Sequence, residues 1–200
     1  MIAIIDYGAG NLFSVQNALN YLGIDNKITS DKQEIINADR LILPGVGAFG
    51  DAMDKLSKSE LVDTVKSEAV KKPFLGICLG MQLLFEKSFE FGEHEGLGLI
   101  KGSVKLMRPD GNLAVPQMGW NSLEYNKECS LLNGIDEGQD VYFVHSYAAD
   151  CSGDYVYAYA DYGGKVPALV GNGDTVYGAQ FHPEKSGETG LEILRRFSIL

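Results

Sequence analysis

The sequence predicts an α/β fold: a central mixed, mostly parallel sheet flanked by helices, with antiparallel strands added in the second half of the chain. Three observations support this prediction. In the first half, short apolar runs alternate with amphipathic helices, the order of a doubly wound sheet. From Leu97 onward the chain is rich in strands and turns instead. The 200 residues are 45% hydrophobic, enough for the core of a single domain spanning residues 1–200.

The first half supplies the parallel strands and the helices that connect them. Continuous apolar runs are typical of strands buried on both faces, and apolar side chains at helical spacing indicate amphipathic helices. The expected strands are 2–6, one around Ile28, 40–43 and 74–77. The expected helices are 12–22, a short one opened by a Ser30–Gln33 capping box, and 59–71.

The reactive group is predicted at the sharp turn after the strand at 74–77. Cys78 lies between Gly76 and Gly80, and an apolar helix is expected over 79–85. This is the glycine–x–nucleophile–x–glycine elbow, in which glycines remove Cβ atoms that would clash. The elbow sets the sulfur at a helix N-terminus, which favours the thiolate. A cysteine that merely packs in the core is the alternative, but the two glycines favour a nucleophile.

A glycine-rich loop, 44–50, follows the strand at 40–43. Because parallel strands end at the same edge of a sheet, this loop and the Cys78 elbow are expected to lie together where open α/β folds bind ligands. Gly8 and Gly10 begin a pattern seen in dinucleotide sites, but Phe13 stands where the third glycine is needed. A bound nucleotide is therefore not expected.

The second half is predicted to add strands and a closing helix. Tyrosines alternate with small residues over 155–160, the period of a strand with two unlike faces, and 171–174 reads as a hairpin turn. The expected strands are 103–107, 120–125, 141–147, 155–160, 166–170 and 175–181, and the helix is 186–200.

His182 is the predicted base for Cys78. It is followed by a proline that biases it toward extended backbone, where residues two apart point the same way, so Glu184 can hold its ring. The chain has only three histidines. His145 also ends a predicted strand and is the rival base, but it lacks a carboxylate two residues on. His94 stands between two glutamates in a polar loop.

Composition excludes several classes of function. A net charge of −10 argues against nucleic acid and membrane surfaces as partners, since both attract basic proteins. No apolar run could span a bilayer, and the N-terminal residues lack the pattern of a signal peptide. The three cysteines are odd in number and show no metal-ligand spacing. We therefore expect a cytoplasmic protein without metal or cofactor.

Together these motifs resemble the class I, triad-type glutamine amidotransferases. That resemblance rests on Gly76-Ile77-Cys78-Leu79-Gly80-Met81-Gln82 and on His182-Pro183-Glu184. More narrowly, the chain looks like the glutaminase subunits of imidazole glycerol phosphate synthase. Five blocks spread over nearly the whole chain carry the narrower resemblance: 6–12, 44–49, 95–100, 116–121 and 142–147. One position departs from the pattern, because Gln117 stands where these relatives usually carry histidine.

The resemblance implies hydrolysis of glutamine to glutamate and ammonia by a Cys78–His182–Glu184 triad through a thioester. The backbone N–H groups of Leu79 and of a residue near Val46 would form the oxyanion hole, the second after a peptide flip that flanking glycines ease. The resemblance places four further residues around the substrate: Gly47, Gln82, Glu90 and Ser146.

The resemblance also implies a partner, a (β/α)₈ barrel cyclase subunit that forms a heterodimer with the glutaminase. The cyclase would use the ammonia to make imidazole glycerol phosphate and aminoimidazole carboxamide ribonucleotide in histidine biosynthesis. Asn11, Trp120 and Lys185 match positions at or near that interface. Each has an ordinary alternative, respectively a helix cap, a core aromatic and a surface charge.

Three alternative functions stay open at this point. A glutaminase subunit of pyridoxal phosphate synthase has the same triad, but its loop typically reads Gly-Gly-Glu-Ser where this chain has Gly45-Val46-Gly47-Ala48. A non-catalytic regulatory module would not need the intact triad. A stand-alone cysteine hydrolase of γ-glutamyl compounds would need no barrel partner.

Overall fold

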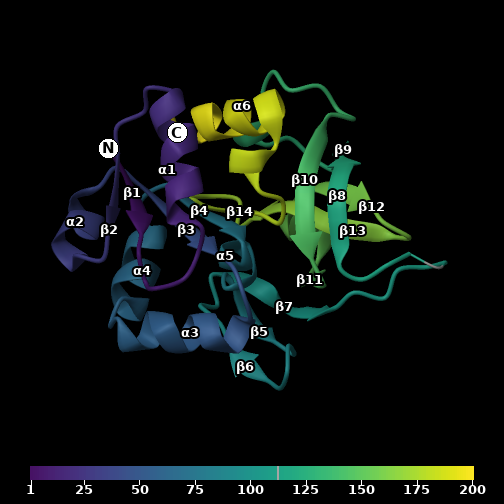
Figure 1. Ribbon diagram of the computed structural model, residues 1–200, viewed down its shortest axis with the longest axis horizontal. Coiled ribbons are helices and arrows are strands. Elements are labelled where there is room, and N and C mark those ends of the chain that lie inside the picture. Colours follow the sequence, from purple (N-terminus) through teal and green to yellow (C-terminus); the bar gives the residue numbers. More distant parts are fainter. Residues whose placement is uncertain (112) are drawn as a thin grey trace.

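An eight-stranded mixed sheet crosses the computed structural model, which describes residues 1–111 and 113–200 (Figure 1). Its strand order is β2-β1-β3-β4-β14-β13-β12-β9. The strands are β1 (Ile2–Ile5), β2 (Asn26–Thr29), β3 (Arg40–Gly45), β4 (Phe74–Cys78), β9 (Glu124–Tyr125), β12 (Val156–Asp161), β13 (Lys165–Gly171) and β14 (Val176–Ala179). Neighbours from β2 to β14 pair in parallel, and those from β14 to β9 pair antiparallel. The predicted mixed, mostly parallel sheet is therefore confirmed.

Helices cover both faces of this sheet, and each face has its own apolar core (Figure 1). The helices are α1 (Leu12–Tyr21), α2 (Lys32–Asn37), α3 (Phe49–Lys58), α4 (Val62–Ala69), α5 (Leu79–Gln82) and α6 (Gly187–Phe197). Val15 of α1 and Leu194 of α6 belong to one core, whereas Ile35, Leu56 and Val65 of α2, α3 and α4 belong to the other. No helix in the described residues is long and apolar enough to cross a membrane.

Two smaller sheets accompany the main one. β8 (Gln117–Ser122) pairs antiparallel with β10 (Asp140–His145). A four-stranded sheet has the order β11-β7-β5-β6 and consists of β5 (Phe85–Ser88), β6 (His94–Glu95), β7 (Ile100–Leu106) and β11 (Tyr147–Asp150). The described residues also form three short 3₁₀ helices: η1 (Ser130–Leu132), η2 (Gly153–Tyr155) and η3 (Pro183–Lys185).

The helices after β3 differ from the sequence-based expectation. The helix expected at 59–71 is α4, and a separate helix, α3, begins at Phe49 inside the stretch predicted as a glycine-rich loop. Phe49, Ala52 and Leu56 are buried at helical spacing. The N–H of Phe49 donates to a carboxylate oxygen of Glu90 at 2.7 Å, a cap that comes from 41 residues away. A local pattern could not show this contact.

Three other boundaries were also wrong. The helix expected over 79–85 ends at Gln82, because the carbonyls of Leu83, Leu84 and Phe85 accept hydrogen bonds from residues 97–100. Asp31, rather than Ser30, caps α2 by accepting the N–H of residue 34 at 2.9 Å. The strand expected over 120–125 is divided between β8, which pairs with β10, and β9, which pairs with β12.

Glycines let three backbone segments touch at the ends of β3 and β4. A Cβ atom on Gly80 would lie 1.8 Å from the carbonyl oxygen of Leu43. A Cβ on Gly76 would lie 2.5 Å from the carbonyl oxygen of Gly80, and one on Gly45 would lie 2.6 Å from the Gly80 nitrogen. Only hydrogen fits at these three positions, so the loop after β3 is pressed directly onto the turn after β4.

We predict that Gly80→Ala lowers the free energy of unfolding by at least about 2 kcal/mol, because the methyl group meets backbone that cannot move aside. Urea denaturation measures the loss. Gly153→Ala is the matched control, since its Cβ would make an ordinary contact 3.4 Å from the Tyr159 hydroxyl. Equal stabilities of Gly80→Ala and Gly153→Ala would contradict the close packing described above.

Candidate active site

Cys78 lies at the end of β4 with backbone angles of φ 55° and ψ −111°, and α5 begins at the next residue. A positive φ is uncommon for a residue with a side chain and marks the sharp strand-to-helix turn of a nucleophile elbow. The strain is tolerated because Gly76 and Gly80, on either side of Cys78, allow close backbone packing that fixes this turn. The elbow predicted from the sequence is therefore present in the structure.

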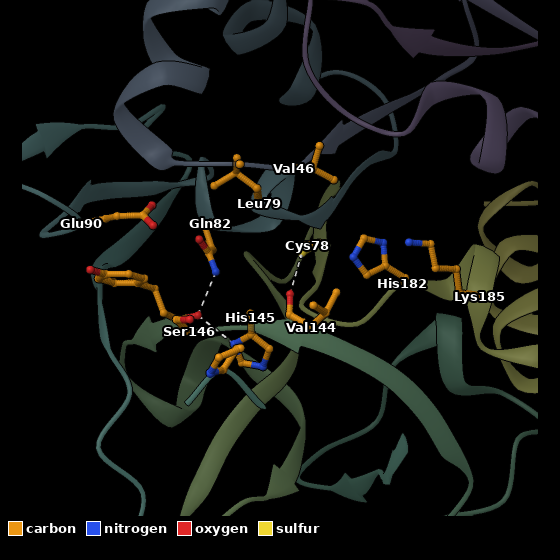
Figure 2. A pocket seen from close by; sticks show the side chains of 13 residues that line it. Val46, Cys78, Leu79, Gln82, Glu90, Val144, His145, Ser146, His182 and Lys185 are labelled. Atoms are coloured by element: carbon orange, nitrogen blue, oxygen red, sulfur yellow. Dashed lines mark hydrogen bonds between the residues drawn. The ribbon is translucent and has the colours of Figure 1, made fainter. Parts of the chain in front are cut away.

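The Cys78 thiol opens into a pocket with a volume of about 430 Å³. Most of the residues predicted for the site line it: Val46, Gly47, Cys78, Leu79, Gln82, Glu90, Ser146, His182 and Lys185. Figure 2 shows His182 and Lys185 on one side of Cys78, and Gln82 and Glu90 on the other. The pocket therefore has a basic end and an end that offers amide and carboxylate groups.

His182 and Glu184 form a buried pair beside the pocket. His182 Nδ1 lies 2.8 Å from a carboxylate oxygen of Glu184, and the two side chains are 3% and 1% exposed. Burial, the largest influence, lowers the pKa of His182, but the Cys78 sulfur and the Glu184 carboxylate together outweigh it and raise the pKa to about 9. The ring therefore carries a proton at neutral pH and can donate it inside the pocket.

His145, the rival base, has a different environment. Burial lowers the pKa of His145 to about 4, so its ring is neutral near pH 7. Its Nδ1 lies 2.8 Å from the carbonyl oxygen of Tyr147, and its Nε2 lies 3.1 Å from the Gln117 side chain. Both ring nitrogens are occupied by neighbours other than Cys78, which favours His182 as the base. His94 is in β6, where its ring packs against Gly50.

Two of the predicted substrate-binding side chains already have protein partners. The Gln82 amide nitrogen donates to the Tyr147 carbonyl at 2.9 Å and to the Gln180 side-chain oxygen at 3.0 Å. One Glu90 oxygen accepts the Phe49 N–H. The single Gln82 side-chain oxygen and the other Glu90 oxygen are left, so both side chains present acceptors rather than donors to the pocket.

Gln180 was missed in the sequence analysis. It is fully buried, and its amide nitrogen lies 3.9 Å from the Cys78 sulfur, the same distance as the Val144 carbonyl oxygen. A signal existed: Gln180 precedes His182 by two residues at the end of a predicted strand, where alternate side chains point the same way.

The loop after β3 is anchored at its start. The Tyr7 hydroxyl donates to the Pro44 carbonyl at 3.0 Å, and burial is the main reason why the pKa of Tyr7 is raised. Gly45 is the register partner of Cys78. Gly47 follows with φ +99°, a conformation that residues with side chains rarely adopt, and its Cβ position is open. Val46, which is exposed, and Gly47 are therefore the part of this loop that close packing does not fix.

The three residues predicted at a partner interface lie in three different settings. Asn11 caps α1 by accepting the Ser14 N–H at 3.3 Å. Trp120 is not a core aromatic: it is 58% exposed, and its ring meets that of Tyr142 edge to face at 6.0 Å. Lys185 lines the pocket. Among the described residues there is no cluster of His, Cys, Asp or Glu that could hold a metal ion.

Comparison with known proteins places the fold in a family. The family described as glutamine amidotransferase class-I matches residues 3–200. A protein named imidazole glycerol phosphate synthase subunit HisH from Bacillus thuringiensis (strain Al Hakam) is 52% identical over 198 residues, which are 98% of this chain and 93% of the relative. The HisH of Caldanaerobacter subterraneus subsp. tengcongensis is 56% identical over 199 residues, with coverages of 98% and 97%.

Solved structures with much lower identity share the fold. A crystal structure described as a glutamine amidotransferase has a TM-score of 0.75 at 21% identity and covers 98% of this chain and 99% of its own. The structure of PurLQS from Thermotoga maritima also has a TM-score of 0.75, at 20% identity, with coverages of 98% and 96%. These likenesses confirm the predicted α/β architecture.

The raised pKa of His182 predicts that the chain loses stability as the pH rises through about 9. An unfolded histidine has a pKa of about 6.5. Between these values the folded chain holds a proton that the unfolded chain does not, so the stabilisation is complete below about pH 6.5 and is lost above about pH 9. Urea denaturation from about pH 6 to pH 10 measures the slope.

The variant His182→Asn isolates this contribution from that of the other groups that titrate in the same range. Cys129 and Cys151 are such groups, because each thiol titrates at about pH 8.5 in the unfolded chain, whereas burial raises its pKa to about 11 in the folded chain. The slope should be smaller in the variant than in the wild type. Equal slopes would show that His182 does not hold the proton.

Proposed function

The chain belongs to the class I glutamine amidotransferase family, and we propose that it hydrolyses glutamine to glutamate and ammonia with the Cys78–His182–Glu184 triad. Its function is that of the glutaminase subunit of imidazole glycerol phosphate synthase in histidine biosynthesis, as its relatives of 52–56% identity over nearly the whole chain indicate. The observation that carries the proposed mechanism is the Cys78 elbow, which opens into the same pocket as the buried His182–Glu184 pair.

In the proposed reaction, the Cys78 thiolate attacks the side-chain amide carbon of glutamine. The carbonyl oxygen becomes an oxyanion, which accepts hydrogen bonds from the Leu79 N–H and from an N–H of the Val46–Gly47 segment. Protonated His182 gives its proton to the departing nitrogen, and ammonia leaves a glutamyl thioester on Cys78. Water, deprotonated by the now neutral His182, then hydrolyses the thioester to glutamate and restores the thiolate–imidazolium pair.

The far end of the pocket suits the α-ammonium group of glutamine. The Gln82 amide nitrogen is occupied by the Tyr147 carbonyl and by Gln180, so its oxygen is the atom left for the substrate. Glu90 also lines the pocket and adds a carboxylate: one oxygen accepts the Phe49 N–H, and the other can accept from the substrate. A cationic ammonium is attracted by these acceptors, and Gly47 and Ser146 on the pocket wall are the proposed neighbours of the substrate's carboxylate end.

The oxyanion hole depends on the conformation of the Val46–Gly47 segment. Pro44 is held by the Tyr7 hydroxyl, and Gly45 is pressed against Gly80, so neither can move without breaking packed contacts. We therefore assign a peptide flip to Val46 and Gly47. A resting conformation that turns a carbonyl toward the oxyanion position would leave only the Leu79 N–H as donor.

This chain is a subunit of a complex with a cyclase, as the names of its relatives imply. We propose that the partner is a (β/α)₈ barrel that forms a heterodimer with it over the pocket edge. Trp120 and Met118, both on β8, are 58% and 65% exposed. The Trp120 ring contacts Tyr142, whose carbonyl accepts the His182 N–H at 2.9 Å. A partner that covers Trp120 would thus be linked to His182 through Trp120 and Tyr142.

We predict that the cyclase and its nucleotide substrate raise the kcat of glutamine hydrolysis by about 10²–10³, the effect of gaining one oxyanion donor, and change KM much less. Steady-state assays of glutamate release, with and without the partner, measure both constants. Cys78→Ser in the complex is the control that assigns the activity to this site.

Two results would contradict the proposal in different ways. A free chain with the same kcat as the complex would exclude the conformational switch but not the triad. A complex that releases no glutamate from glutamine, although both subunits are folded and associated, would exclude the proposed function itself.

A further inference from the structure

A row of buried polar side chains lies behind the glutamine-binding wall of the pocket. Gln117 on β8 faces His145 on β10, because the two residues are register partners in an antiparallel pair. From His145 the row continues through the Tyr147 carbonyl to Gln82 and Gln180. The four side chains, Gln117, His145, Gln82 and Gln180, are between 0% and 6% exposed. We call them the buried amide row.

The tautomer of His145 follows from its neighbours. Its Nδ1 lies 2.8 Å from the Tyr147 carbonyl oxygen, which can only accept, so Nδ1 carries the proton. The ring is neutral near pH 7 because burial lowers its pKa to about 4. Its Nε2 is therefore an unprotonated acceptor. An acceptor in this buried position needs a donor.

Among the residues that the structure describes, Gln117 is the side chain within hydrogen-bond distance of that nitrogen. The Gln117 oxygen lies 3.1 Å from His145 Nε2, which sets two acceptors against each other. The Gln117 amide nitrogen has no partner among the residues that the structure describes. The two ends of an amide have nearly the same shape, and the hydrogen-bond network decides between them. Turning the Gln117 amide by about 180° places its nitrogen next to His145 Nε2. The nitrogen then has an acceptor, and Nε2 has a donor.

We propose that the Gln117 amide nitrogen donates to His145 Nε2, and that Gln117 is thereby a positioning residue for the glutamine-binding wall. The bond fixes the His145 ring, whose Nδ1–H holds the Tyr147 carbonyl. That same carbonyl accepts the Gln82 N–H, which leaves the Gln82 oxygen aimed at the pocket. Gln117 touches neither substrate nor Cys78 and acts through these neighbours.

The first test reads the histidine ring directly in the free chain. Long-range ¹H–¹⁵N NMR on histidine-labelled protein distinguishes the two tautomers, and the chain has only three histidines to assign. We expect a protonated Nδ1 and a hydrogen-bonded, unprotonated Nε2 on His145 near pH 7. In Gln117→Met the Nε2 resonance should move toward that of an unbonded nitrogen. Gln117→Glu, which keeps the shape but offers acceptors, should place a proton on Nε2.

The second test is kinetic and uses the complex with the cyclase, so it rests on the proposed function. Gln117→Met should raise the KM for glutamine about 3- to 10-fold, the range of one hydrogen bond, with a smaller change in kcat. Gln117→His keeps a ring N–H donor and should restore the KM. Gln33→Met is the matched control, because Gln33 is an exposed residue on α2 and its replacement should change neither constant.

The outcomes separate the inference from the proposed function. A protonated Nε2 on wild-type His145, or a His145 resonance that Gln117→Met leaves unchanged, would overturn the proposed bond whatever the enzyme does. An unchanged KM in both Gln117→Met and Gln117→Glu would overturn the positioning role. Absence of glutaminase activity in the wild-type complex would overturn the proposed function and leave the NMR result standing.

Discussion

The backbone contact between the loop after β3 and the turn after β4 is the constraint on which the site depends. Gly45, Gly76 and Gly80 leave out side chains that would separate the two segments. The contact holds Cys78 in a positive-φ conformation that would otherwise be unfavourable, and it sets the Val46–Gly47 segment beside the sulfur. Nucleophile and oxyanion loop therefore share one packed junction, and only the outer part of the loop is left free to change conformation.

Polar groups around this junction are buried, and hydrogen bonds offset the loss of water. The His182–Glu184 pair keeps a charged ring inside the protein because the Glu184 carboxylate and the Cys78 sulfur both favour the protonated form. His145 lies nearby without such a charge and stays neutral. The two histidines of the pocket thus differ in protonation because of their neighbours. This difference separates the proposed base from a residue that holds the wall in place.

Local sequence patterns predicted the elbow and the His182–Glu184 pair, because the spacing of a few neighbouring residues determines both. They also predicted the parallel strands, whose apolar runs are continuous. They did not predict contacts made over long distances in the sequence. The cap of α3 and the end of α5 both depend on residues much later in the sequence, namely Glu90 and residues 97–100. Gln180 and the pairing of Gln117 with His145 likewise required the tertiary structure.

The elbow makes Cys78 the proposed nucleophile of this chain. Treatment with an electrophile that mimics glutamine, followed by peptide mass spectrometry, tests it directly. We predict an adduct on Cys78 that excess glutamine prevents, and none on Cys129 or Cys151, whose thiols have pKa values raised to about 11 by burial. An adduct on Cys129 or Cys151 with Cys78 unmodified would show that Cys78 is not the nucleophile.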